Sequence, residues 1–187
     1  LNQFLFHILI YHKIFYLQRY GGISNYFINL CDQVKLFHDV KIIAPIHVNN
    51  YLEKFEKKNK LTFIKLKKQF KYTRKISNTI NDYFFNNYCN FKSPDIVHLT
   101  YFDRQISFKK RFKIVVTVYD LIHEIYEKKY NFKYSKNFKY NYLNVADEII
   151  CISENTKRDL IKYYNIDEKK ITVIYLGVNK KKELKEI

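Results

Sequence analysis

The sequence predicts an α/β fold in which helices cover both faces of one doubly wound parallel sheet. Apolar runs of strand length alternate with segments of helical period along the 187 residues, a pattern typical of repeated β–α units. Several of the runs are continuous and β-branched, as expected for strands that are buried on both faces of a sheet. Hydrophobic residues make up 47% of the chain, which is enough for the core of one good-sized domain.

The first half of the chain supplies three of the predicted strands. Residues 4–11 (FLFHILIY) form an apolar run of strand length, residues 39–44 form a second, and residues 61–66 form a short third. A polar, aromatic loop leads from the first strand to a glycine pair. Apolar residues then recur at steps of three and four, which predicts a helix with one apolar face. The helices predicted in this half span residues 23–37, 50–59 and 73–90.

The second half repeats the alternation with stronger signals. Its predicted strands are residues 95–99, 113–118, 147–152 and 171–176. A helix is predicted at residues 135–146. Ser153 is well placed as the N-cap of another helix, which ends near Tyr164.

The net charge of +16 requires either a partner or a compositional explanation. An AT-rich coding sequence would enrich lysine without any function. The functional alternatives are an anionic membrane surface, an acidic or phosphorylated substrate, and nucleic acid. Arginine dominates the specific recognition of bases and phosphates, so its scarcity here argues against nucleic acid. The lysine- and aromatic-rich stretch 54–75 could rest on anionic lipid, and a solvated basic face is the equal alternative.

Three cysteines, Cys31, Cys89 and Cys151, are too far apart in sequence for a zinc site or a disulfide framework. We interpret them as small buried residues in a reducing compartment, and we predict no metal site. The N-terminal apolar run is too short to span a bilayer and no cleavage site follows it, which predicts a cytoplasmic protein. The chain begins with Leu1 and contains no methionine, which indicates a fragment or a truncated reading frame.

Candidate binding residues follow the predicted strands, because ligands of open parallel sheets bind outside the carboxyl ends of the strands. Arg19, Gly21 and Gly22 follow the first strand. The glycines let the backbone approach a ligand closely, and the exposed N–H groups at the start of the next helix favour an anion such as a phosphate. A tight turn without a ligand is the alternative for an isolated glycine pair.

Asp120 and Ser153 lie after two later strands. Asp120 follows an uncharged strand and should emerge at the edge of the sheet, where it could bind a sugar hydroxyl or act as a base. An ordinary loop or capping aspartate is the alternative, and the same ambiguity applies to His123 and Glu124. Ser153 could face a phosphate at its helix N-terminus or serve only as a cap.

Three segments in this order resemble the N-terminal half of family 4 glycosyltransferases: RYGGISNYFINL, KIVVTVYDLIHE and ADEIICISENTKRDLIKYYNIDEKKITVIYLGVN. The resemblance runs from Tyr11 to Asn179, with little of it in residues 46–94. It implies the GT-B fold of two Rossmann-like domains and transfer of a sugar from a nucleotide donor with retention of configuration. It implies no cofactor and no obligatory metal, since the nucleotide sugar is a co-substrate.

On this resemblance, residues 1–178 are the Rossmann-like acceptor-side domain and residues 179–187 begin an interdomain linker or a frayed tail. The second domain, which would hold most of the donor, is absent from the sequence. We therefore expect the chain alone to turn over little. The expected partners are a glycan or lipid-linked sugar acceptor and, through the missing domain, a nucleotide sugar. The alternative is a non-catalytic remnant or a split-enzyme module that binds a partner domain or the inner face of an anionic membrane.

The resemblance also implies roles for individual residues. Gly21 and Gly22 would lie near the donor phosphates and the acceptor, with Arg19 and Ser153 as further substrate- or phosphate-binding residues. Tyr119 and Asp120 occupy a position where the family often has His-Asp, which makes them the catalytic candidates: Asp120 matches this pair, whereas Tyr119 departs from it and replaces the histidine. Tyrosine can donate a hydrogen bond there, but it cannot reproduce the near-neutral titration of histidine.

Overall fold

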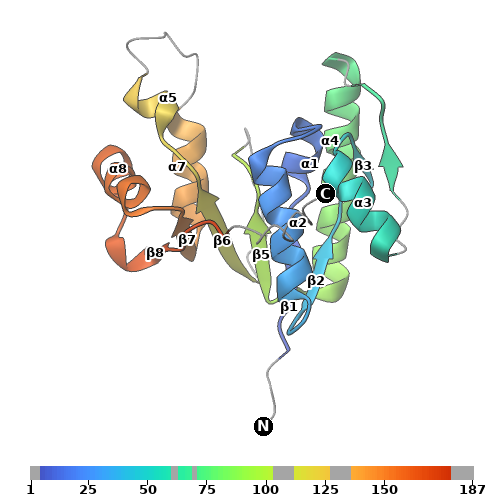
Figure 1. Ribbon diagram of the computed structural model, residues 1–187, viewed down its shortest axis with the longest axis horizontal. Helices are drawn as coiled ribbons and strands as arrows, with labels where there is room; N and C mark the ends of the chain where they lie inside the picture. Colours follow the sequence, from blue (N-terminus) through green and yellow to red (C-terminus); the bar gives the residue numbers. More distant parts are fainter. Residues whose placement is uncertain (1–4, 60–62, 69–70, 103–111, 127–135, 178–187) are drawn as a thin grey trace, which may run out of the picture.

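A computed structural model describes residues 5–59, 63–68, 71–102, 112–126 and 136–177 of the chain (Figure 1). Its centre is a six-stranded sheet whose paired strands are all parallel. The strands lie in the order β2 (Asp39–Ile42), β1 (His7–Ile10), β5 (Ile96–Leu99), β6 (Lys113–Val118), β7 (Glu148–Cys151) and β8 (Ile171–Val173). The predicted fold class is confirmed.

Hydrophobic clusters lie on both faces of this sheet. Leu9 and Ile10 are neighbours on β1, are both buried, and belong to different clusters, because successive side chains of a strand point to opposite faces. The Ile10 face packs against α2 (Gly22–Val34) through Phe27, and also against α3 (Asn50–Asn59). The Leu9 face carries the larger cluster, which includes residues of α4 (Lys71–Lys92), α7 (Lys136–Val145) and α8 (Glu154–Tyr164).

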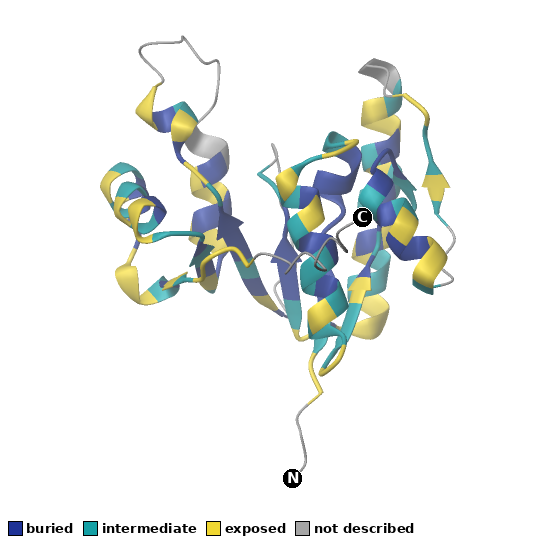
Figure 2. Ribbon diagram, in the orientation of Figure 1, coloured by how far each residue is buried: buried dark blue, intermediate teal, exposed yellow. Residues whose placement is uncertain are grey.

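Coverage of the sheet is uneven across its width. Figure 2 shows the strands as the most buried part of the molecule and the outer faces of the helices as exposed. Over β6, β7 and β8, the face that continues from Ile10 is less covered by the described residues: Val115 and Ile150 are half-buried and Thr172 is exposed. On the Ile10 face, the sheet is therefore packed less completely over β6, β7 and β8 than over the other strands.

A second, two-stranded parallel sheet lies outside the main one. It pairs β3 (Ile46–His47) with β4 (Ile64–Lys65), and β4 falls within the short strand predicted at 61–66. The described elements that were not predicted are β3, α1 (Lys13–Leu17), α5 (Ile122–Ile125) and the 3-10 turn Glu168–Lys170. The final strand is shorter than predicted, ending at Val173, and residues 174–176 are exposed.

Helix α1 lies in a segment that we expected to be a loop. Ile14, Phe15 and Tyr16 are all completely buried, so the helix has no polar face along these positions. A short helix that is buried on all sides gives no period of 3.6 in the sequence. For this reason the segment could not be identified as helical from its pattern.

Two further predictions concern cysteine and the membrane. All three cysteines are free thiols; Cys31 and Cys151 are buried and Cys89 is half-buried. Burial raises the pKa of each thiol to about 12, so they are unreactive at neutral pH. Within the described residues, no helix has both the length and the apolar character needed to cross a bilayer.

Candidate functional site

The carboxyl ends of the six parallel strands meet at one edge of the sheet, which we call the carboxyl edge. Two contacts bring the sequence candidates together there. The Tyr119 ring, just after β6, packs edge-on against Tyr26 near the start of α2, with ring centroids 5.8 Å apart. The Tyr119 carbonyl accepts a hydrogen bond of 3.4 Å from Thr156 Oγ1, and Thr156 Oγ1 lies 3.0 Å from Ser153 Oγ. The glycine pair, Tyr119, Asp120 and Ser153 therefore share this edge.

Gly21 is the N-cap of α2, and the side chain of Gln18 packs closely against it. A Cβ atom on Gly21 would come 2.2 Å from Gln18 Oε1, whereas a Cβ on Gly22 would meet nothing within 4 Å. Gln18 Oε1 accepts a hydrogen bond from the Ser24 N–H (3.3 Å), and Ser24 Oγ donates to the Gly21 carbonyl (3.0 Å). A side chain at position 21 would therefore require the flexible end of Gln18 to move. A phosphate at this helix N-terminus would have to displace the Gln18 amide.

The Tyr119 side chain turns inward from the carboxyl edge. Its ring packs against the cluster that contains Ile10 and Phe27, and its hydroxyl is buried without a hydrogen-bond partner among the described residues. Burial, with a smaller contribution from Tyr26, raises the pKa of this hydroxyl far above its ordinary value. The phenol is thus a neutral core group in this structure and offers no proton to the carboxyl edge at physiological pH.

Asp120 remains at the surface and is exposed. Its Oδ1 accepts a hydrogen bond of 3.1 Å from the Ile122 N–H at the start of α5, the local pattern of a turn aspartate. Oδ2 has no hydrogen-bond partner within the described part of the chain, so one carboxylate oxygen is available to a ligand. The turn role of Asp120 uses only Oδ1, so it is compatible with ligand binding through Oδ2.

Glu124, the other acidic residue in this segment, is buried and forms an internal ion pair. Its Oε1 lies 2.8 Å from Lys139 Nζ of α7, and both side chains are almost completely buried. Tyr164 of α8 donates its hydroxyl hydrogen to the same oxygen, and Lys139 Nζ also donates to the Asp120 carbonyl (3.3 Å). Glu124 therefore joins three helices and supports the Asp120 loop from below, and it does not face a ligand.

Ser153 caps α8 as the sequence predicts. Its Oγ accepts a hydrogen bond of 3.1 Å from the Thr156 N–H, and the helix ends at Tyr164, followed by Asn165 in the left-handed conformation. The cap satisfies one N–H of the first turn. Its oxygen already accepts this bond and contacts Thr156 Oγ1, so Ser153 has a structural role whether or not it binds a phosphate.

Arg19 lies in a separate part of the carboxyl edge, in a hollow that sequence reasoning did not identify. A hollow of about 280 Å³ is lined by Leu17, Arg19, Val48, Lys67 and Lys68. A second of about 700 Å³ shares three of these residues. We call this region, around Arg19, Lys67 and Lys68, the basic hollow. Both lysines belong to the stretch 54–75, where no local pattern separates a binding lysine from a solvated one.

Tyr101, after β5, connects the two parts of the edge. Burial and the negative charge of Asp120 raise the pKa of its hydroxyl, and the positive charge of Arg74 acts in the opposite direction. Both charged groups therefore lie near this phenol. Arg74 follows Thr73, which lines the basic hollow. A further hollow, of about 910 Å³, lies elsewhere, at the amino ends of β5, β6 and β7. It is distant from all of the candidates.

Several solved structures are similar to this chain, and two of them are glycosyltransferases of known description. A glycosyltransferase from Rickettsia africae ESF-5 superimposes with a TM-score of 0.55 at 24% identity, over 94% of this chain and 44% of that protein. The lipopolysaccharide outer core galactosyltransferase WaaB in its apo form gives a TM-score of 0.53 at 15% identity, over 94% of this chain and 46% of WaaB. The chain therefore spans less than half the length of either, and at these identities the likeness concerns the fold. No curated protein matches significantly.

The family comparison is more specific than the fold. The sequence profile described as Glycosyltransferase Family 4 matches residues 20–182, a span that begins at the glycine loop and includes the Tyr119–Asp120 segment and the Ser153 helix. Most of the chain lies within this match, and we conclude that the protein belongs to glycosyltransferase family 4.

Proposed function

We propose that this chain is the Rossmann-like acceptor-side domain of a glycosyltransferase that moves a sugar from a nucleotide donor to a glycan or lipid-linked acceptor with retention of configuration. The observation that carries the proposal is the meeting of the glycine loop, Asp120 and the Ser153 helix at one edge of a parallel sheet in a family 4 chain. Ligands of such sheets bind at this edge.

In the proposed reaction the acceptor hydroxyl oxygen bonds to the anomeric carbon, and the bond from that carbon to the donor phosphate breaks. The nucleoside diphosphate leaves, and the hydroxyl proton passes to it. The free Oδ2 of Asp120 accepts a hydrogen bond from a sugar hydroxyl and orients the acceptor, as proximity catalysis requires. Tyr119 acts as a positioning residue, because its partly buried ring packs against the core and holds the backbone that carries Asp120. The proposed reaction requires no cofactor and no obligatory metal.

The donor side of the cleft lies outside this sequence in the proposal. Residues 1–178 form one wall, and residues 179–187, which lie outside the described residues, begin the linker to the second. Because an interdomain site needs both walls to exclude water and hold the donor, the chain alone turns over little. A separately encoded donor domain or a catalytically inactive remnant is the alternative organisation.

A membrane-facing role is the second candidate, and one surface favours it. Ile64 and Ile76 are 62% and 61% exposed, and the neighbouring Lys67, Lys68 and Lys75 are also exposed. Exposed apolar side chains among cations are suited to an anionic bilayer surface. The proposed location is cytoplasmic, at the inner face of the membrane. Co-sedimentation with anionic vesicles at low and high salt tests it, and absence of binding at low salt would refute it.

The main proposal is tested by glycan-array binding of the labelled chain, together with hydrolysis of a panel of nucleotide sugars. We expect glycan binding that Asp120→Asn removes, with donor hydrolysis near background. Asp167→Asn is the matched control, because Asp167 is also exposed and also accepts one backbone N–H, from Lys169 at 3.0 Å. Absence of glycan binding would refute the acceptor-side assignment. Clear hydrolysis of a nucleotide sugar by the chain alone would refute the proposal that the donor side of the cleft lies outside this sequence.

A further inference from the structure

The basic hollow contains three cationic side chains whose charges are unpaired among the described residues. Arg19, Lys67 and Lys68 all line it, and none of the three side chains has a hydrogen bond or ion pair with a described residue. Other lysines in this region are paired: Lys58 with Asp32 at 3.1 Å and Lys65 with Glu53 at 2.6 Å. The described residues that line the hollow include no carboxylate. The charges therefore remain available to an anion.

The backbone that carries Arg19 is held by hydrogen bonds from Asn49 and Asn50. Asn49 Nδ2 donates to the Gln18 carbonyl at 2.6 Å, and the Asn50 N–H donates to the Arg19 carbonyl at 3.0 Å. Asn49 is held in turn, since its N–H donates to His47 Nδ1 at 3.1 Å and its Oδ1 accepts from the Leu52 N–H at 2.9 Å. Arg19 thus extends from a backbone fixed at two successive carbonyls.

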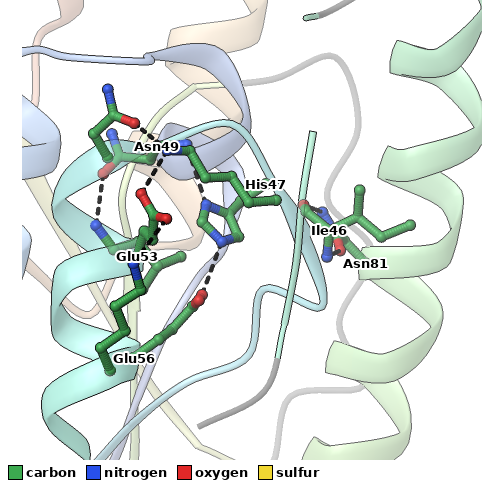
Figure 3. Close-up of polar contacts among 10 residues, drawn as sticks. Ile46, His47, Asn49, Glu53, Glu56 and Asn81 are labelled. Atoms are coloured by element: carbon green, nitrogen blue, oxygen red, sulfur yellow. Dashed lines mark hydrogen bonds and ion pairs between the residues drawn. The ribbon is translucent and has the colours of Figure 1, made fainter. Parts of the chain in front are cut away.

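The segment that carries Lys67 and Lys68 is attached to the same frame. The Leu66 N–H donates to the His47 carbonyl at 2.7 Å, which continues the pairing of β3 with β4. Lys65 contacts both Glu53 and Asn50 of α3. His47 Nε2 lies 2.8 Å from Glu56 Oε1, and both side chains are buried (Figure 3). The small second sheet therefore places the two lysines opposite Arg19.

We infer that Arg19, Lys67 and Lys68 form a phosphate-binding subsite that holds the phosphate of a sugar-phosphate acceptor, either free or linked to a lipid. A guanidinium offers two parallel N–H donors to phosphate oxygens, and two ammonium groups add charge without a fixed direction. Such a subsite recognises phosphate through three cations in a concave surface. The inference assigns Lys67 and Lys68 to binding and deepens the proposed function, on which the identity of the ligand as an acceptor rests.

The position of the subsite favours the acceptor over the donor. The hollow lies beside the second sheet, on the α3 and α4 side of the carboxyl edge, and the chain continues from Thr73 in its wall to Arg74 near Tyr101 and Asp120. An acceptor whose phosphate occupies the hollow can extend along this edge toward Asp120. The donor phosphates are expected at the glycine loop instead, where Gln18 now covers the helix N-terminus.

Binding of glucose 1-phosphate, glucose and inorganic phosphate to the purified chain, measured by calorimetry, tests the subsite. We expect glucose 1-phosphate to bind, glucose to bind far more weakly, and Lys67→Gln/Lys68→Gln to weaken phosphate binding about tenfold or more. Lys41→Gln/Lys92→Gln is the matched control, since it removes two equally exposed lysines outside the hollow. Affinity unchanged by the Lys67/Lys68 variant, or reduced equally by the control, would overturn the inference.

Two further measurements assign the ligand. Co-sedimentation with phosphatidylcholine vesicles that contain a polyprenyl phosphate separates a lipid-linked source from a free one, because only the former shows Lys67- and Lys68-dependent binding to these vesicles. The Lys67→Gln/Lys68→Gln variant should weaken binding of a nucleoside diphosphate less than binding of glucose 1-phosphate. An equal loss for both ligands would overturn the assignment to the acceptor. If the chain binds phosphate but no glycan, the glycosyl-transfer proposal is refuted and the phosphate subsite is still supported. Failure of the proposed function can therefore be distinguished from failure of the subsite.

Discussion

The two sides of the carboxyl edge are held in place by different interactions. On the glycine-loop side, Asn49 Nδ2 and the Asn50 N–H hold the Gln18 and Arg19 carbonyls, and the segment that carries them is held in turn by amide hydrogen bonds and by the contacts of His47 with Glu56 and of Lys65 with Glu53. On the Asp120 side, the loop rests on one buried ion pair between Glu124 and Lys139, with Tyr164 as a third member. One side distributes its stability over several contacts, whereas the other concentrates it in one buried ion pair.

This difference determines how each side responds to substitution. A neutral hydrogen bond contributes about 0.5–1.5 kcal/mol net, so the amide network should lose stability in small steps. A buried ion pair contributes little relative to apolar residues, but loss of one partner leaves the other charge buried and uncompensated. The Asp120 side should therefore tolerate single changes poorly and paired changes well.

The largest expected effect follows from Lys139→Met. It leaves the Glu124 carboxylate buried without its partner, and we expect the free energy of unfolding to fall by about 3–5 kcal/mol in urea denaturation. The double variant Glu124→Leu/Lys139→Met should recover more than half of that loss. If the double variant is as unstable as the single one, contacts of Lys139 other than its ion pair with Glu124, such as that of its ammonium group with the Phe102 ring, hold this side together.

The second prediction concerns the pH dependence of stability. Burial lowers the pKa of His98 to about 3, below the ordinary value of about 6.5 in the unfolded chain. Between these values the unfolded state binds the extra proton, so the His98 contribution is complete above about pH 6.5 and is lost as pH falls toward 3. Between these two pKa values, His98→Gln should reduce the slope of the free energy of unfolding against pH by up to about 1.4 kcal/mol per pH unit. Parallel stability curves for both proteins would contradict the prediction.

A smaller effect is expected from Asn49→Ala on the glycine-loop side. The variant loses the bonds from Asn49 to the Gln18 carbonyl and the Leu52 N–H, and the free energy of unfolding should fall by about 1–3 kcal/mol because buried groups lose their partners. Asn29→Ala is the control, since its amide makes one exposed bond to the Asn25 carbonyl and should cost less than about 0.5 kcal/mol. Phosphate binding should weaken with Asn49→Ala alone, as Arg19 loses its support.

The same two sides differ in how much of them the sequence predicts. Strand β6 has the predicted bounds, and the Ser153 helix ends at the predicted Tyr164, because a continuous β-branched run and a capping serine are local signals. The shared position of Tyr119, Asp120 and Ser153 followed from strand direction alone, since parallel strands have their carboxyl ends on one edge.

Interactions between distant residues could not be predicted in this way. Lys139 looks like any other lysine on a helix until the fold brings it to Glu124, and Lys67 lies far from Arg19 in sequence. The small sheet has only two residues in each strand, which is too short for an alternating pattern. The inward orientation of Tyr119 was also beyond the sequence, because a residue after a strand can point to either side.

Tyr119→Phe should have the smallest effect, and it tests whether the Tyr119 phenol is a core group. Its hydroxyl is buried without a partner in the described part of the chain, as is that of Tyr16 in α1 on the other side. Because removal of an unsatisfied buried hydroxyl relieves a desolvation cost, both Tyr119→Phe and Tyr16→Phe should leave the free energy of unfolding unchanged or raise it by about 1 kcal/mol or less. Glycan binding should also persist in both variants. Loss of binding with Tyr119→Phe alone would mean that the hydroxyl turns toward the ligand, and Tyr119 would then contact substrate directly.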